Sequence, residues 1–147
     1  MFALRVATHA DLDDLVPRTR ALNDHEGITV PTETLRKAMA ELLASPSLGG
    51  VWIITRDAQT IGYAIVTFGF DLEFSGRDAW MTELFIDEAH RGTGAGAAAI
   101  ELIMPELASR EVGALHLQVR PENPAKKLYE RTGFVASPRI VMTRTVR

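Results

Sequence analysis

The sequence contains no cysteine. Disulfide bonds, thiolate ligands for a metal and a nucleophilic cysteine are therefore all excluded, and no reaction can pass through an acylated cysteine. The absence leaves the redox compartment undetermined. We expect no bound metal.

Long apolar runs and clusters of basic residues are also missing. The opening segment, MFALRVATHADLDDL, lacks a basic stretch followed by a sufficiently long apolar one, so we expect no secretory signal and a cytoplasmic protein. The formal net charge is −3, and no window carries the basic cluster that follows a phosphate backbone. We therefore expect neither a nucleic-acid partner nor a membrane partner.

What remains is the composition of an ordinary globular protein. Hydrophobic residues make up 46% of the 147 residues and charged residues 24%. A chain of this length buries about two thirds of the surface that it exposes when unfolded. It contains no internal repeat and no long linker, so we expect residues 1–147 to form a single domain.

The N-terminal part predicts a short strand and two helices. Residues 4–6 suit a strand, and Thr8 with Asp11 resembles a capping box before apolar residues at helical spacing. Pro17 is expected to kink this first helix. Thr32 is expected to cap the second helix, whose apolar stripe consists of Leu35, Met39, Leu42 and Leu43.

The middle of the chain predicts an antiparallel meander. Residues 51–55 and 61–68 are β-branched and aromatic runs separated by a polar turn, which is typical of a hairpin. Residues 69–78 are expected to form a loop. Residues 79–86 then supply a third strand.

The C-terminal part predicts two helices and two strands. A helix is expected over 97–110, kinked or broken at Pro105, and a strand over 114–119. A short helix follows, which Asn123 is expected to cap, and 139–146 is expected to be the last strand.

The stretch HRGTGAG, residues 90–96, has three interpretations. Its glycines can simply turn the chain and let a helix pack closely on the sheet. Gly92, Gly94 and Ala97 also satisfy the dinucleotide pattern G-x-G-x-x-G/A, although the preceding strands look antiparallel. The third interpretation is an anion site, because a glycine turn before a helix presents free N–H groups to a phosphate.

Residues around these glycines carry a family resemblance. RGTGAG fits R/Q-x-x-G-x-G/A and resembles the pyrophosphate-binding motif of the GCN5-related N-acetyltransferases. ELFIDEAHRGTGAG is similar to the fourth strand and following loop of that family, and LHLQVRPENPAKKLYERTGF to its fifth strand and the helix after it. The resemblance covers about residues 80–134.

The resemblance implies a fold and a co-substrate. The fold would be α/β, a mixed and mostly antiparallel sheet of six or seven strands, with helices on both faces and strands 4 and 5 splayed. Acetyl-CoA would enter that opening, with its pyrophosphate on the glycine loop and its pantetheine arm along the fourth strand. The cofactor-binding residues implied are Leu84, Phe85, Ile86, Arg91, Gly92, Thr93, Gly94, Ala95, Gly96, Ala97 and Asn123.

Two catalytic residues are also expected. Tyr129 stands where the family has a tyrosine that protonates the departing thiolate, although it can equally be a packed aromatic. If strand pairing is regular, Glu83 shares a face with Met81 and Phe85 and has the raised pKa that suits a general base. A carboxylate held by an arginine such as Arg120 is the alternative.

Three further features bear on the reaction. A bulge in the fourth strand, implied by the resemblance, would free an N–H near Phe85 or Ile86 to polarise the thioester oxygen. His116 can relay a proton, but a lone strand histidine is more often structural. Acidic residues in the loop 69–78 would favour a cationic acceptor, or they are simply solvated.

The function implied is acetyl transfer to a primary amine, in a small molecule or a peptide, by direct attack in a ternary complex. Two alternatives stay open, a non-catalytic acyl-CoA-binding module of the same fold and a dinucleotide-binding enzyme. A homodimer would be common for the family.

Overall fold

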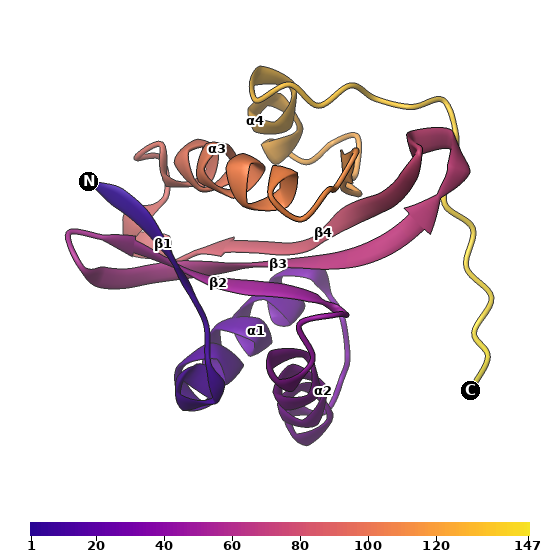
Figure 1. Ribbon diagram of the computed structural model, residues 1–147. Coiled ribbons are helices and arrows are strands. Elements are labelled where there is room, and N and C mark those ends of the chain that lie inside the picture. The colour runs from indigo at the N-terminus through magenta and orange to yellow at the C-terminus, as the bar shows by residue number, and fades with distance from the viewer.

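One mixed sheet forms the middle layer of the protein, and helices cover both of its faces (Figure 1). The computed structural model describes residues 1–147. The five strands follow one another in the order of the sequence and are β1 (Phe2–Val6), β2 (Gly49–Arg56), β3 (Gln59–Asp71), β4 (Gly76–Ile86) and β5 (Leu115–His116). The α/β class and the covered sheet are as expected, but the sheet has five strands rather than six or seven.

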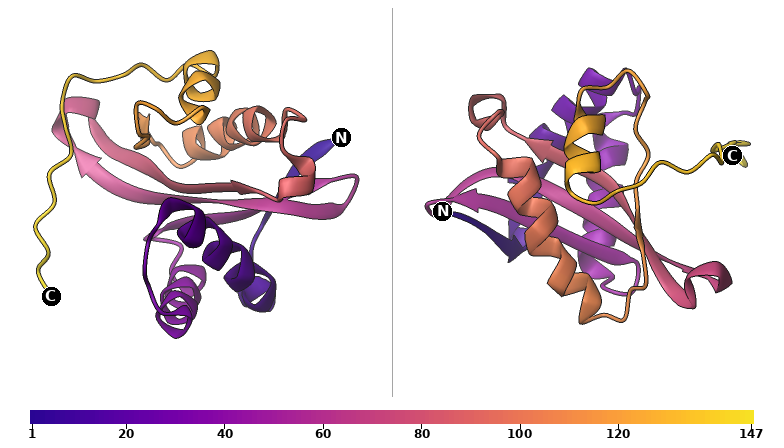
Figure 2. Two further views of the ribbon diagram at one scale, coloured as in Figure 1. Left: turned by 180° about the vertical axis from the view of Figure 1, so that it is seen from behind. Right: turned by 90° about the horizontal axis from the view of Figure 1, so that it is seen from above.

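The helices divide between the two faces of the sheet. One face carries α1 (Leu12–Glu26) and α2 (Thr32–Ala44), and the other carries α3 (Ala95–Ala108) and α4 (Ala125–Arg131) (Figure 2). Three short 3-10 turns, η1 (His9–Asp11), η2 (Leu72–Phe74) and η3 (Glu88–His90), complete the chain. No helix combines the length and the apolar character that crossing a membrane requires.

Strands β1 to β4 pair antiparallel, whereas β5 pairs parallel to β4. The parallel pair exists because α3 forms the crossover between β4 and β5. It is short, since only Ala79 with Leu115 and Trp80 with His116 are in register. From Met81 onward β4 therefore has a partner on its β3 side alone.

The prediction of a loop over residues 69–78 is wrong. β3 and β4 continue through most of this segment and pair as far as Asp71 with Gly76. Gly69 is not a turn residue: a Cβ placed there would lie 2.7 Å from Oδ1 of Asp78, so the glycine makes room for a neighbouring side chain. The actual turn is η2 with Ser75, which has a φ of 66°.

The strand expected over 139–146 is also absent. Residues 135–147 lie outside every helix and strand, and in Figure 1 they leave the body of the protein as an extended tail. The β-branched composition favours extended backbone, but a strand also requires a neighbour with which to pair. The tail has no such neighbour within its own chain.

The starts of α2, α3 and α4 fall within two residues of their predicted positions, whereas α1 begins at Leu12, later than the predicted Thr8 cap implies. Asp11 accepts a hydrogen bond from the N–H of Thr8 at 2.8 Å, the return contact of a capping box, although the turn that it opens is η1 rather than α1. Thr32 is the first residue of α2, and Pro31 is its cap. α3 begins two residues early and continues through Pro105 without a break.

The core consists of two apolar clusters, one on each face of the sheet. On the α3 side, the buried strand residues pack against Ala95, Ala99, Ile100, Ile103 and Leu107. On the other side, Tyr63, Ile65 and Phe85 of the sheet pack against Leu15 and Val16 of α1 and Met39 of α2. Each face thus buries the apolar stripe of its helices, which is the main source of stability.

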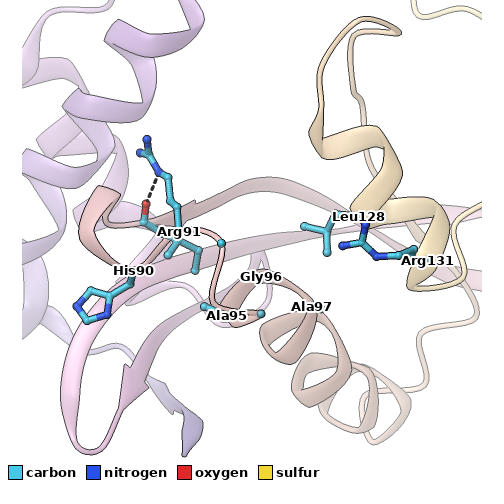
Figure 3. Close-up of a pocket in the computed structure, with 10 residues that line it drawn as sticks. His90, Arg91, Ala95, Gly96, Ala97, Leu128 and Arg131 are labelled. Carbon is cyan, nitrogen blue, oxygen red and sulfur yellow. Dashed lines mark hydrogen bonds between the residues drawn. The ribbon is translucent and has the colours of Figure 1, made fainter.

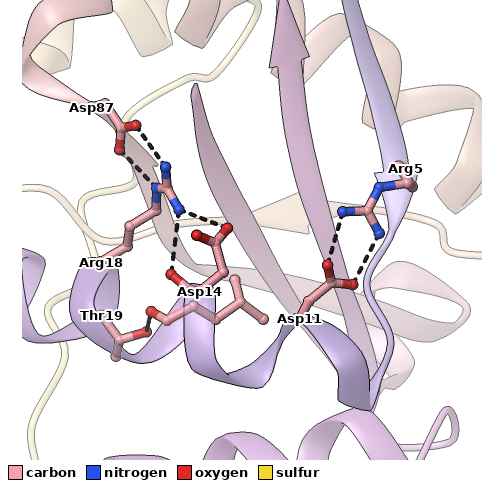
Figure 4. A network of polar contacts seen from close by, with 7 residues as sticks. Arg5, Asp11, Asp14, Arg18, Thr19 and Asp87 are labelled. Atoms are coloured by element: carbon pink, nitrogen blue, oxygen red, sulfur yellow. Dashed lines mark hydrogen bonds and ion pairs between the residues drawn. The ribbon is translucent and has the colours of Figure 1, made fainter. Parts of the chain in front are cut away.

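An ion pair fixes α1 to the end of β4. Arg18 donates from its guanidinium to both carboxylate oxygens of Asp87, each at 2.8 Å, and it also contacts Asp14 (Figure 4). Arg18 and Asp87 are both half-buried. Such a bidentate pair has a fixed geometry. It therefore sets the position of the segment that follows β4.

Removing Asp87 should destabilise the protein more than removing an exposed acid. In Asp87→Ala the half-buried guanidinium of Arg18 loses its main partner, and we expect a loss of about 1–3 kcal/mol in the free energy of unfolding. The control is Asp13→Ala, which breaks the exposed pair with Arg36 and should cost less than about 1 kcal/mol. Urea unfolding measures both, and equal losses would contradict the anchoring role of Asp87.

Candidate active site

An opening lies between β4 and β5, as the resemblance implied. The two strands are in register only at Ala79 and Trp80 of β4, and the later part of β4 has no neighbour on that side. The cause of the separation is visible in the register of β3 and β4. Ile65 pairs with Glu83 but Val66 pairs with Met81, so Thr82 is an extra residue in β4. This is a β-bulge, which bends its strand and ends regular pairing.

The bulge also reverses which face of the sheet each side chain reaches. Met81 packs in the cluster on the α3 side, whereas Phe85 packs in the cluster on the α1 and α2 side. Glu83 lies on the same side as Phe85, because its carboxylate contacts Tyr63 of that cluster. The expectation that Met81 and Glu83 share a face is therefore wrong, and the extra residue at Thr82 is the reason.

Main-chain groups of β4 face the opening. The N–H of Asp87 donates to Ile61 on the β3 side at 2.7 Å. Because main-chain groups alternate in direction along a strand, those of Leu84 and Ile86 point the other way, toward the opening. The carbonyl of Ile86 accepts a hydrogen bond from Nε of Arg91 at 3.0 Å, which agrees with this direction.

The glycine loop precedes α3 at the edge of this opening, and its glycines serve different purposes. Gly92 and Gly94 have φ values of 74° and 87°, a region that other residues rarely adopt. Gly96 lies within α3, where a Cβ would be 3.0 Å from Cδ2 of Leu128 in α4. Two glycines therefore turn the chain, and the third lets the two helices approach closely.

The turn leaves a row of main-chain N–H groups without partners. None of the six N–H groups of residues 92–97 donates a hydrogen bond to any group of the protein. Thr93 supports the turn with its hydroxyl, which donates to the carbonyl of His90 at 2.6 Å. Free N–H groups at the positive end of a helix dipole are a common site for phosphate.

A pocket of about 240 Å³ lies against this loop. Figure 3 shows Leu128 and Arg131 reaching it from α4, across from Ala95, Gly96 and Ala97. Arg131 brings a positive charge that the sequence interpretation missed. The signal was its spacing, because Arg131 follows Leu128 by three residues and so shares its helix face.

The structure gives Arg91 a different position from that expected of a phosphate ligand. Its side chain points away from the glycine turn (Figure 3), and its guanidinium lies 5.5 Å from the ring centre of Phe85. The contact with Ile86 ties the loop to the end of β4. Arg91 thus lines the pocket, but its charge is directed toward α1.

Asn123 caps the start of α4 but does not line the pocket. Its Oδ1 accepts a hydrogen bond from the N–H of Ala125 at 2.9 Å. The helix itself begins at Ala125, with Pro124 before it, one residue later than predicted. Its capping contact is therefore present, and its predicted contact with a cofactor stays a prediction.

Glu83 is half-buried and bonded to a tyrosine that the sequence interpretation missed. The hydroxyl of Tyr63, a fully buried residue of β3, donates to Oε1 of Glu83 at 2.6 Å. Burial raises the pKa of Glu83 above its usual range, and the Tyr63 hydrogen bond opposes this shift by stabilising the carboxylate. Nothing in a single sequence marks Tyr63, because the contact joins two strands across the bulge. Arg120 is not a hydrogen-bonding partner of Glu83.

Tyr129 lies on α4 and packs against the α3-side core. Its ring meets that of Phe134 edge to face, with the ring centres 5.9 Å apart. Burial raises the pKa of Tyr129, and the negative charge of Glu26 at the end of α1 adds to the effect. The phenol is therefore a weaker acid than a free tyrosine side chain and carries its proton at neutral pH.

Two other groups of acidic and histidine residues lie apart from this arrangement. His116 forms a 3.0 Å contact between its Nε2 and the buried Asp78, and its ring packs against Phe74 and Trp80. Because the ring nitrogen of His116 already has a partner, these contacts favour a structural role for His116 over a proton relay. Asp71 and Glu73 lie at the end of the β3–β4 hairpin, about seven strand residues and on the order of 20 Å from Glu83.

Known structures share this architecture. A protein from an integron cassette of the Cole Harbour Salt Marsh metagenome has 27% sequence identity and a TM-score of 0.87, over 98% of this chain and 90% of that one. A Clostridium difficile protein, described as a possible acetyltransferase, has 19% identity and a TM-score of 0.87, with 100% and 99% covered. A Clostridium acetobutylicum structure, described as a "predicted acetyltransferase with acetyl-CoA", has 23% identity and a TM-score of 0.78, with 98% and 96% covered.

The sequence itself identifies the family. Comparison with curated proteins finds no significant match. The profile described as "Acetyltransferase (GNAT) family" matches residues 18–134, which include the bulged strand, the glycine loop and α4. β4 pairs antiparallel with β3, and its parallel pairing with β5 is limited to two residue pairs, so the glycine loop does not lie in the extended parallel sheet that a dinucleotide site needs. Since the match spans most of the chain, the protein belongs to the acetyltransferase (GNAT) family and is an N-acetyltransferase.

Proposed function

We propose that this protein transfers an acetyl group from acetyl-CoA to a primary amine by direct attack in a ternary complex. The observation that carries the proposal is the row of six free N–H groups at residues 92–97, directly beside the unpaired edge of β4. The free N–H groups suit a pyrophosphate, and the unpaired edge of β4 suits the amides of a pantetheine arm. The two meet at the end of β4, as the two parts of coenzyme A require.

The residues present fit coenzyme A. The amides of 92–97 and the N-terminal end of α3 supply partial positive charge, and Arg131 adds a full charge on the opposite wall. Leu84 and Ile86 offer main-chain donors and acceptors to an extended ligand, in the manner of an added strand. When bound, acetyl-CoA supplies a thioester carbonyl that an amine can attack.

Glu83 is the proposed general base. It takes a proton from the ammonium of the acceptor, so that the neutral amine can attack the thioester carbon. Its raised pKa keeps it basic enough for this task, and Tyr63 holds its carboxylate in position as a positioning residue. Glu83 lies on the face of the sheet that carries α1 and α2, so the acceptor approaches from that side.

Tyr129 and a main-chain N–H complete the proposal. As the carbon–sulfur bond breaks, Tyr129 donates its proton to the departing thiolate and leaves coenzyme A with a neutral thiol. The negative charge that develops on the thioester oxygen is stabilised by an N–H of β4, from Leu84 or Ile86, which points into the opening. The nitrogen loses a second proton when the tetrahedral intermediate collapses to the amide, and this proton returns to Tyr129 through solvent, while the proton held by Glu83 is released to solvent.

The acceptor side carries negative charge. A second pocket, of about 430 Å³, lies between α1 and the segment after β4 and includes Asp14, Asp87 and Glu88. Acidic groups attract cationic amines. Arg18 and Arg91 also line this pocket and leave it a formal net charge of −1, and Glu88 is the acid that forms no ion pair.

Gly94→Ala should weaken the binding of coenzyme A, while its loss of stability should be no larger than that of a matched glycine variant elsewhere in the chain. The change places a residue with a Cβ at a positive φ beside the free amides. We expect the affinity for coenzyme A to fall at least tenfold, about 1.4 kcal/mol. Gly27→Ala is the matched control, because Gly27 also has a positive φ and open space around it but lies at the end of α1. Calorimetric titration with coenzyme A measures both, and unchanged affinity in Gly94→Ala would refute the phosphate site.

Two variants should change the pH profile in different ways. Glu83→Gln should lower kcat about 100-fold and remove the acidic limb that Glu83 contributes. Tyr63→Phe removes a hydrogen bond that favours the charged carboxylate, so the pKa of Glu83 should rise and the acidic limb should move to higher pH. Profiles of kcat/KM for the amine test both. A Tyr63→Phe profile that moves to lower pH, or does not move, contradicts the positioning role.

Tyr129→Phe should lower turnover and leave co-substrate binding intact. Loss of the proton donor predicts a fall in kcat of about 100-fold, because the thiolate must then leave unprotonated. The packing against Phe134 is kept, so the affinity for coenzyme A should stay within about twofold of wild type. Thiol release from acetyl-CoA with a panel of amines gives kcat, and unchanged turnover would exclude Tyr129 as the acid.

A further inference from the structure

The side of α1 that faces the sheet changes from apolar to polar along the helix. Its first half buries leucine and valine side chains, and the same side continues with Thr19, Asn23 and Glu26. Positions i, i+4 and i+7 lie on one side of a helix, so these side chains form a row, which we call the α1 row. The α1 row lies toward the sheet face that carries Glu83.

The α1 row begins beside the proposed base. Tyr63, whose hydroxyl donates to Glu83, is fully buried. Burial and the negative charge of Glu83 raise the pKa of Tyr63, and a hydrogen bond with Thr19 opposes that rise. Thr19 therefore contacts the same hydroxyl that holds the carboxylate of Glu83.

The α1 row ends near the proposed acid. α1 and α4 cover opposite faces of the sheet (Figure 1), yet the charge of Glu26 acts on Tyr129. Burial is the main cause that raises the pKa of Tyr129, and Glu26 raises it further, an effect that acts only at short range. The two side chains therefore approach each other through the opening between β4 and β5, where no strand lies between the faces. The α1 row thus leads from the base to the acid.

Asn23, in the middle of the row, is buried without a partner. Its side chain is only 7% exposed, and its amide forms no hydrogen bond with any group of the protein. The amide atoms are not sealed from solvent, so a ligand can reach them. Buried polar side chains almost always have a partner, and a free amide at this depth therefore indicates a group that a ligand satisfies.

Glu26 has no positive partner in the protein. It is half-buried, and its carboxylate forms neither an ion pair nor a hydrogen bond. The arginines of α1 are already engaged. Arg18 binds the end of β4, and Arg20 binds Asp24 and two main-chain carbonyls of the loop after α1. The negative charge of Glu26 is thus available to a ligand.

An acceptor with a single amino group would leave this charge without a partner. Once Glu83 has taken its proton, the reacting amine is neutral. The carboxylate of Glu26 then keeps its charge beside the buried phenol of Tyr129. A second amino group on the acceptor, which stays protonated, supplies the missing positive charge, and Oδ1 of Asn23 can accept one of its N–H groups.

We propose that the α1 row selects a diamine as the acceptor, with the reacting amino group at Glu83 and the second amino group at Glu26. The inference rests on the proposed acetyl transfer, which gives Glu83 its role. Thr19 and Glu26 are about 10 Å apart along the helix axis, at a rise of about 1.5 Å per residue. Because both side chains turn toward the acceptor, an aliphatic linker of about five carbon atoms fits between the two amino groups.

Binding of two matched amines tests the subsite without catalysis. The pair is 1,5-diaminopentane and 1-aminopentane, which differ only in the second amino group. By calorimetric titration the wild type should bind the diamine about tenfold more tightly, and Glu26→Gln should lose this preference. Asn23→Leu should weaken the diamine but leave the stability to urea at least as high as in the wild type, because the amide has no partner in the free protein.

Two other acids serve as controls. Glu33→Gln removes an exposed negative charge at the start of α2 and should leave the preference for the diamine unchanged. Glu88→Gln removes the unpaired acid of the second pocket, which faces a different side of α1, and should also keep the preference. If Glu88→Gln loses the preference and Glu26→Gln keeps it, the second amino group lies in that pocket and the proposal is wrong. Equal affinity of the wild type for the two amines also overturns it.

Turnover distinguishes this inference from the proposed function. With acetyl-CoA, Glu26→Gln should lower kcat/KM for the diamine about tenfold more than kcat/KM for the monoamine. If the wild type acetylates both amines with equal kcat/KM, acetyl transfer stands and the diamine class is wrong. If neither amine is acetylated but the wild type binds the diamine more tightly and Glu26→Gln does not, the subsite stands and the proposed transfer is wrong.

Discussion

The extra residue at Thr82 is the constraint from which the rest of the site follows. It interrupts the pairing of β3 and β4, and β5 diverges from β4 at the same level. The later half of β4 consequently has free main-chain groups on one side. The bulge also turns Glu83 away from the α3 side and toward Tyr63, on the face that carries α1 and α2. One inserted residue thus has two effects. It leaves one edge of β4 free to pair with an extended ligand, and it places the Glu83 carboxylate on the sheet face that carries α1 and α2.

Contacts with α1 and α4 hold the glycine loop in place. Arg18 fixes Asp87 at the end of β4, and Arg91 ties the loop back to Ile86, so the turn begins from a rigid point. On its other side, Gly96 admits Leu128 of α4 to close contact with α3. The free amides of 92–97 are therefore preorganised, which reduces the ordering that a bound anion would otherwise require.

Local patterns in the sequence predicted the local structure well. The hairpin of β2 and β3, the start of α2 and the turn before α3 depend on residues close to one another in the chain. Features that depend on pairing between distant segments were missed. Met81 was assigned to the wrong face because a bulge leaves no mark in the residue pattern, and Tyr63 and Arg131 come to the site from other elements. The segment 139–146 has the composition of a strand, but composition does not supply the partner.

At Glu83, catalysis and stability make opposite demands. Its pKa in the folded protein is raised above the unfolded value, mainly by burial. Stability from such a group is complete below the unfolded pKa and is lost as the pH rises through the folded pKa, because ionisation then places a charge in a poorly solvated site. The proposed base must be ionised to accept a proton, so it works in the pH range where it weakens the fold. The Tyr63 hydrogen bond relieves part of this conflict, since it stabilises the ionised carboxylate without exposing it to water.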